Sequence, residues 1–208
     1  ISLKKILDCP VLGEEMTEAE QKQIWADNRD ALWCVDPIDG TTNFANGIPY
    51  FAISVALMKN HQAVLGAVYD PVADEIFYAE KGKGAFLNGV ELPIKERVPS
   101  LREAVAEIDL KRLDEKLAAA LAAHPPYSSA RNFGASTLDW CYVAAGRFDV
   151  RQRRRRPERH QHDLAAGITH AHRRDMHPAR GRLRADDGFV DELRHRRSRP
   201  GAPPRCCD

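Results

Sequence analysis

The sequence predicts a mixed α/β fold of the α+β kind, and three patterns support that prediction. A strongly apolar run, residues 32–35, predicts a buried strand that ends at an aspartate. Residues 51–79 contain three further β-rich runs separated by polar turns. Residues 112–123 are rich in Leu, Ala and Lys, and residues 137–145 repeat apolar side chains at helical spacing, so we expect both to be helices.

The charge distribution divides the chain into two parts. The 208 residues, 43% of them hydrophobic, are enough for one sizeable domain or for most of a larger one. Residues 1–150 carry 15 Lys and Arg against 22 Asp and Glu, whereas residues 151–208 carry 16 against 8, and all 16 are Arg. We therefore predict a domain in residues 1–150 and a separate Arg-rich segment in residues 151–208.

Composition also restricts where the protein works. No apolar run is long enough for a transmembrane helix and no signal peptide is present, so we expect a cytoplasmic protein. Cys9, Cys34 and Cys141 lie singly in or beside apolar segments, which is typical of buried thiols. The adjacent Cys206 and Cys207 have no second pair with which to form a zinc site, so we assign no metal to cysteine.

The first elements in the chain are a short strand and a helix. Residues 11–13 predict a strand that ends at two acids, Glu14 and Glu15. Thr17 can then cap a helix, with Glu20 completing a capping box. Taken alone, the two acids are equally typical of solvated charges near a helix start. Because the chain opens on Ile1, we expect that it starts at an interior point of a longer protein.

The acidic segment after residues 32–35 is the most informative part of the sequence. It presents Asp36 and Asp39 three residues apart, and we expect a turn at Pro37 to bring them together. The carbonyl of Ile38 lies between them as a third hard oxygen. Carboxylate and carbonyl oxygens suit Mg²⁺.

The residues that follow favour an anion beside that metal. Gly40 lets the backbone approach a bound anion, and Thr41 and Thr42 can cap a helix whose N–H groups face it. An ordinary acidic turn is the competing interpretation, because Asp-Pro and Asp-Gly are common turn dipeptides.

The rest of the domain predicts a scaffold and one further candidate segment. We expect strands at residues 51–58, 63–69 and 75–79, and a hairpin at Asn88-Gly89. The helix at 112–123 should stop before Pro125. Gly134 opens the helix at 137–145, which is compatible either with substrate binding or with a plain loop-to-helix junction.

One string is specific enough to indicate a family. The residues are Asp36-Pro37-Ile38-Asp39-Gly40-Thr41-Thr42-Asn43-Phe44. This string resembles the signature of the inositol monophosphatase family, Mg²⁺-dependent, lithium-sensitive phosphatases of small phosphomonoesters. The resemblance extends from about Val11 to Val150. It implies a layered α-β-α-β-α sandwich, shared with fructose-1,6-bisphosphatase, that is incomplete here at both ends.

The resemblance also implies roles for individual residues. Glu14 would bind metal and, with the Thr41 hydroxyl, orient the attacking water. Two or three Mg²⁺ ions would be held by Glu14, Asp36, the Ile38 carbonyl, Asp39 and Asp163. The substrate would be bound by Gly40, Thr41, Gly134, Ala135 and Ser136.

The resemblance weakens after Val150. Asp163-Leu164-Ala165-Ala166-Gly167 resembles the motif of the last metal-binding aspartate, although His162 replaces the usual Trp and the interval from Asp149 is longer. The Arg-rich segment permits three interpretations: a polyanion-binding region, a solvated disordered tail, or an out-of-frame translation of a GC-rich gene. We favour the third because Lys and aromatic residues nearly vanish at this point.

Two functional hypotheses follow. The first is a phosphomonoesterase that hydrolyses a small polyol or sugar phosphate, such as inositol 1-phosphate, with a metal-activated water. The second is a catalytically inactive partial phosphatase domain with a basic, polyanion-binding tail. In either case we expect neither a membrane nor a nucleic acid as partner. The sequence does not decide the oligomeric state, and a homodimer is one option.

Overall fold

The computed structural model describes residues 3–95 and 100–152. All of them belong to one compact unit, Ile1–Asp175, while the second unit, Met176–Asp208, lies outside the described residues. Asp163 and almost all of the Arg-rich segment also lie outside them, so the three interpretations of that segment remain predictions.

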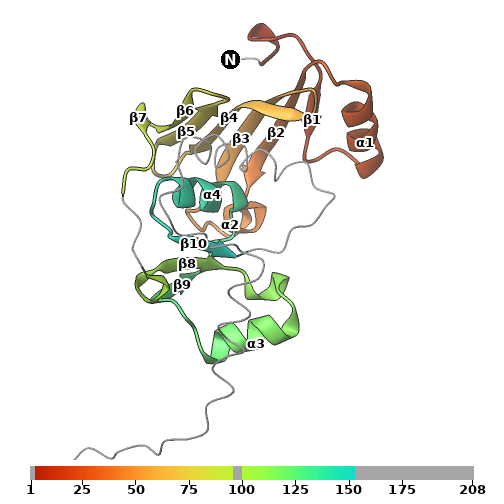
Figure 1. Ribbon diagram of the computed structural model, residues 1–208. Helices are drawn as coiled ribbons and strands as arrows, with labels where there is room; N and C mark the ends of the chain where they lie inside the picture. Colours follow the sequence, from red (N-terminus) through yellow and green to blue (C-terminus); the bar gives the residue numbers. More distant parts are fainter. Residues whose placement is uncertain (1–2, 96–99, 153–208) are drawn as a thin grey trace, which may run out of the picture. The chain divides into compact units, whose positions relative to one another are not determined.

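Within the described residues, seven strands form one sheet in chain order from β1 to β7 (Figure 1). They are β1 (Val11–Gly13), β2 (Leu32–Asp39), β3 (Ala52–Lys59), β4 (Gln62–Asp70), β5 (Glu75–Glu80), β6 (Gly84–Leu87) and β7 (Val90–Glu91). β1 and β2 are parallel, and each later neighbouring pair is antiparallel. The strands expected between residues 51 and 79 are therefore confirmed. So is the hairpin at Asn88-Gly89, where both residues have positive φ.

One face of this sheet is buried and the other is more exposed. On β3 the alternate residues Ala52, Ser54, Ala56 and Met58 are buried, whereas Ile53 is 42% exposed. This period of two is what a strand with a single core face requires. The buried face carries the hydrophobic clusters of this sheet. The acidic residues on β2 pair with buried residues of β3 and therefore lie on this face.

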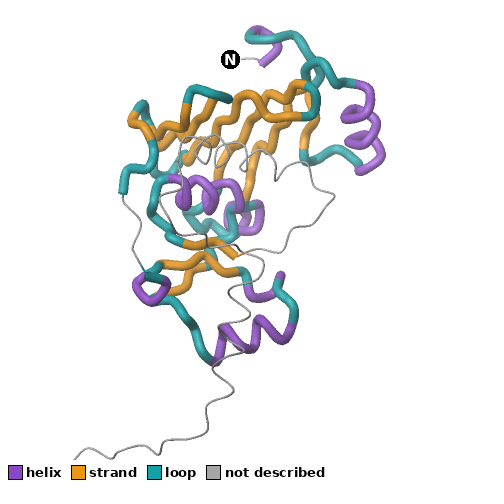
Figure 2. Tube along the Cα trace, viewed as in Figure 1, coloured by secondary structure: helices purple, strands orange, loops and turns teal. Residues whose placement is uncertain are grey.

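A second sheet of three parallel strands lies within the described residues, in the order β10-β8-β9. Its strands are β8 (Val105–Ile108), β9 (Ser129–Arg131) and β10 (Val150–Gln152). Helix α3 (Glu115–Ala123) connects β8 to β9, and α4 (Ser136–Ala144) connects β9 to β10. Because α4 contacts β3 and β4 as well as β10, it links the two sheets (Figure 2).

The remaining helices follow local signals in the sequence. α1 (Glu18–Asp27) begins at the expected capping box of Thr17 and Glu20. α3 starts at Glu115, later than expected, because Asp114 caps it by accepting a hydrogen bond from the Leu117 N–H. The short helix α2 (Thr41–Ala45) follows β2 directly. Single 3-10 turns occur at Leu3–Lys5, Leu101–Glu103 and Leu110–Arg112.

Two further features of the described part of the chain are its helices, compared with a membrane span, and its cysteines. None of its helices is long and apolar enough to cross a membrane. Cys34 and Cys141 are buried, as expected, while Cys9 is only half-buried.

Candidate functional site

A β-bulge in β2 positions the two aspartates of the acidic segment. β2 continues through Pro37 to Asp39, so the predicted turn at Pro37 is wrong. Asp36 pairs with Ser54 on β3, and Asp39 pairs with Ala52, so β2 contains one residue more than β3 over this interval. Ser54 and Ala52 face the same side of β3. The bulge therefore places Asp39 on the side of the sheet that carries Asp36.

Glu14 lies beside Asp36 at the end of the neighbouring strand. Gly13 pairs with Val35, and the Glu14 N–H donates to the Val35 carbonyl at 3.2 Å, which brings the Glu14 side chain opposite Asp36. Burial raises the pKa of Asp36 to about 8, aided by the hydrogen bond that protonated Asp36 donates to the Glu14 carboxylate and by the negative charges of Glu14 and Asp39. Two acids this close cannot both be ionised at low cost without a cation.

Asp39 joins β2 to the start of α4. Its Oδ2 atom accepts hydrogen bonds from the backbone N–H and from the hydroxyl of Thr137, each at 2.5 Å. The N-cap residue of α4, Ala135, has no side chain able to accept such a bond. Asp39 therefore caps α4 from a position 98 residues earlier in the chain.

The glycine of the acidic segment allows close packing at the same point. Gly40 is the N-cap of α2 and has φ of 90°, so α2 is not capped by Thr41 or Thr42 as expected. A Cβ at Gly40 would lie 3.1 Å from the Cβ of Ala135 and 3.2 Å from the Tyr50 carbonyl oxygen. The Thr41 hydroxyl donates to the Ile38 carbonyl at 3.1 Å, so two predicted site groups already contact each other.

Asn43 fixes the segment that was predicted to bind substrate. Its buried side-chain amide donates to the carbonyls of Phe133 and Tyr50, at 2.6 and 2.7 Å. Gly134, with φ of 89°, follows directly. The predicted metal segment and residues 134–136 are thus brought together. Ala135 is fully buried, so it is the flanking residues Gly134 and Ser136 that reach the surface.

A buried polar network lies behind these segments. The Arg151 side chain, 3% exposed, pairs with Glu107 at 2.8 Å and with Asp139 at 3.3 Å, and donates to the Ser136 hydroxyl at 3.2 Å. Burial raises the pKa of Asp139 to about 7, although Arg151 and a hydrogen bond from the Tyr50 hydroxyl favour its charged form.

Sequence patterns did not identify this network. Composition assigns Arg151 to the Arg-rich segment, yet the structure places it in β10 with its charge paired inside the domain. The available signal was Asp139, an acid beside the apolar face of a predicted helix.

The described acids do not by themselves form a metal centre. Within residues 3–95 and 100–152, no group of three His, Cys, Asp or Glu side chains is gathered closely enough to hold a metal ion. Asp39 is turned to Thr137, and Asp163 lies outside the described residues. The carboxylates of Glu14 and Asp36 and the carbonyl of Ile38 nevertheless fit a hard cation, because Mg²⁺ prefers carboxylate and carbonyl oxygens.

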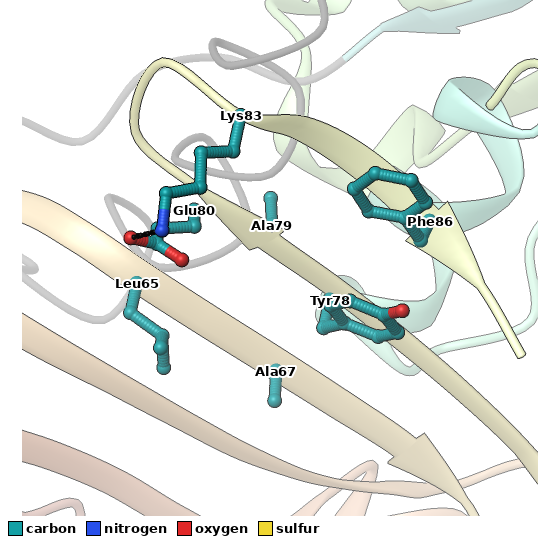
Figure 3. A pocket seen from close by; sticks show the side chains of 7 residues that line it. All are labelled: Leu65, Ala67, Tyr78, Ala79, Glu80, Lys83 and Phe86. Carbon is teal, nitrogen blue, oxygen red and sulfur yellow. Dashed lines mark ion pairs between the residues drawn. The ribbon is translucent and has the colours of Figure 1, made fainter. Parts of the chain in front are cut away.

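A hollow lies on the large sheet (Figure 3). It has a volume of about 460 Å³ and is lined by Leu65, Ala67, Tyr78, Ala79, Glu80, Lys83 and Phe86. Its two charged residues, Lys83 and Glu80, neutralise each other at 2.8 Å. It shares no residue with the acidic segment, and we assign no chemistry to it.

Known proteins resemble the chain in both sequence and fold. Residues 3–170 match the model of the inositol monophosphatase family. The chain is 43% identical to an inositol-1-monophosphatase of Rhizobium meliloti, over 56% of this chain and 46% of that protein. It is 35% identical to a Haemophilus influenzae protein named Nus factor SuhB, over 70% of this chain and 54% of that protein.

A solved structure has the same fold. Inositol monophosphatase II of Staphylococcus aureus, with inositol monophosphate bound, is 26% identical and superimposes with a TM-score of 0.63, over 82% of this chain and 65% of that one. The chain spans about half the length of the curated relatives it matches. The match covers the acidic segment, the segment that packs against it and the layered fold that holds them, and on that basis the chain belongs to the inositol monophosphatase family.

Proposed function

We propose that this protein is a Mg²⁺-dependent phosphomonoesterase that acts on a small polyol or sugar phosphate. The observation that supports it most directly is the convergence of two distant segments. Asp39 and Gly40 contact residues 135–137, so acids suited to a cation lie beside backbone suited to a small ligand. Binding sites that combine a few polar groups with a preformed backbone frame are typical of small-molecule enzymes.

The acidic side would bind the metal. Glu14, Asp36, the Ile38 carbonyl and Asp39 would hold Mg²⁺, with Asp163 as a further ligand. Bound Mg²⁺ would lower the pKa of a coordinated water and polarise the phosphate ester. Glu14 would orient that water together with the Thr41 hydroxyl, which the Ile38 carbonyl already holds in place. The backbone N–H groups of Gly40 and Thr41 would bind phosphate oxygens.

The other side would bind the substrate's organic part. Gly134 is exposed and has no side chain, and the Ser136 hydroxyl is held by Arg151, so the segment offers a small, rigid surface at these two residues. Such a surface suits a compact molecule with several hydroxyl groups. Relatives named for inositol monophosphate make inositol 1-phosphate the first substrate to test.

One observation favours the second hypothesis, a domain that does not catalyse. Both donors of Thr137 bind one oxygen of the Asp39 carboxylate, Oδ2, so a metal would have to share this carboxylate with Thr137. If these bonds are stronger than the bond between Asp39 and a metal, the site would bind Mg²⁺ weakly and turn over no substrate.

Phosphate release from inositol 1-phosphate separates the two hypotheses. We expect hydrolysis to require Mg²⁺ and to be lost in excess chelator and in Asp36→Asn and Asp39→Asn. Asp74→Asn, an exposed acid on the β4–β5 turn, is the matched control and should keep full activity. Hydrolysis that survives both chelator and Asp36→Asn would exclude the proposed site. No hydrolysis by the parent protein with Mg²⁺ would favour the non-catalytic alternative.

A further inference from the structure

Ser54 is a buried hydroxyl with no hydrogen-bond partner in the described part of the chain. The residue is 1% exposed, and its Oγ atom is one of two buried side-chain polar atoms there that lack a partner. A buried, unsatisfied hydroxyl costs about 1–3 kcal/mol. Such a group calls for a partner that appears in another state of the protein.

Ser54 stands directly opposite Asp36 in the antiparallel pairing of β2 and β3. Opposite residues have Cβ atoms about 4.5–5.5 Å apart, a distance that a hydroxyl and a carboxylate can span. Glu14 lies on the other side of Asp36, so the three side chains form a row across β1, β2 and β3. The neighbours of Ser54 on the same face of β3, Ala52 and Ala56, have no donor to offer.

The charged form of Asp36 needs such a donor. Its Oδ1 atom accepts a hydrogen bond from the Ile38 N–H at 3.0 Å. Asp36 is only 6% exposed, and a buried carboxylate is stabilised by further hydrogen-bond donors.

We propose that the Ser54 hydroxyl donates a second hydrogen bond to the ionised Asp36 carboxylate and so orients it toward Mg²⁺. The inference rests on the proposed function, because it concerns the metal-bound state. Ser54 is a positioning residue, since it acts through Asp36. Groups that hydrogen-bond a metal ligand change metal affinity by about 10–100-fold when they are removed.

The test measures two quantities on the full chain. Titration with MgCl₂ by calorimetry gives the Mg²⁺ affinity, and thermal unfolding in chelator gives the metal-free stability. We expect Ser54→Ala to bind Mg²⁺ about 10–100-fold more weakly. Its metal-free stability should equal or exceed that of the parent, because the substitution removes an unsatisfied hydroxyl. A merely structural serine would show the opposite, lower metal-free stability with unchanged affinity.

Cys34→Ala is the matched control. Cys34 is 2% exposed on the same side of β2, two residues before Asp36. Removing its sulfur should lower the stability and leave Mg²⁺ affinity unchanged. Equal Mg²⁺ affinities for the parent and Ser54→Ala would overturn the inference while leaving the metal site intact. If the parent itself does not bind Mg²⁺, both this inference and the proposed function fail.

Discussion

Asp39 should stabilise the fold even when no metal is present, because it caps α4. Replacing it by Asn keeps the size of the side chain and one oxygen acceptor, now an amide oxygen, but removes the charge. A hydrogen bond to a charged group contributes about 1.5–3 kcal/mol and one between neutral groups about 0.5–1.5 kcal/mol. Two bonds from Thr137 are weakened in this way, so we expect a loss of about 2–3 kcal/mol. For a chain of this size, that loss lowers Tm by roughly 4–12 °C.

Urea unfolding in excess chelator is the appropriate assay, since it removes any contribution from metal binding. Asp114→Asn is the matched control, because Asp114 also caps a helix but does so locally on α3. The Asp114 cap is exposed to solvent, where Asn and Asp are nearly equivalent N-caps, whereas the Asp39 bonds are partly buried, so this control should lose only a few tenths of a kcal/mol.

A double-mutant cycle with Thr137→Val tests the pairing itself. Thr137→Val removes the hydroxyl donor and keeps the shape of the side chain. We expect the effects of the two substitutions to be non-additive by about 1 kcal/mol or more, because they affect the same bond. If the effects add to within about 0.5 kcal/mol, or if Asp39→Asn matches the control, the capping role is refuted.

Three further predictions follow from the same structure. Gly40→Ala should destabilise the protein by roughly 2–4 kcal/mol in urea unfolding, because Gly40 has a positive φ and lies close to Ala135. Gly47 also has a positive φ but has open space around it, so Gly47→Ala should cost only about 1–2 kcal/mol. Equal losses in the two variants would contradict the packing argument. Because folding raises the pKa of Asp139 from 3.8 to about 7, its contribution to stability is complete below about pH 4 and is lost as pH rises through 7. The fall in the urea midpoint between pH 5 and pH 8 should therefore be smaller in Asp139→Asn, and an unchanged fall would contradict this assignment. If Asp163 completes the metal centre, Asp163→Asn should weaken Mg²⁺ binding in calorimetry as Asp36→Asn does; an unaltered isotherm for Asp163→Asn would remove it from the site.

The sequence by itself determined most of the local structure. Apolar alternation located the strands from residue 51 to 79, the Asn88-Gly89 pair predicted its hairpin, and Thr17 with Glu20 marked the start of α1. These signals are reliable because they depend on backbone conformation and side-chain period within a few residues. The acidic segment was recognisable for the same reason, as one continuous string.

Only the tertiary structure decided how the site is assembled. The bulge that turns Asp39 toward α4, the place of Ser54 opposite Asp36, and the burial of Arg151 each depend on partners far away in the chain. Composition separated Arg151 from the domain, whereas pairing with Glu107 holds it inside. Strand register and helix docking are set by the burial of whole surfaces, so a local pattern can name the acids of this site but cannot say what each one contacts.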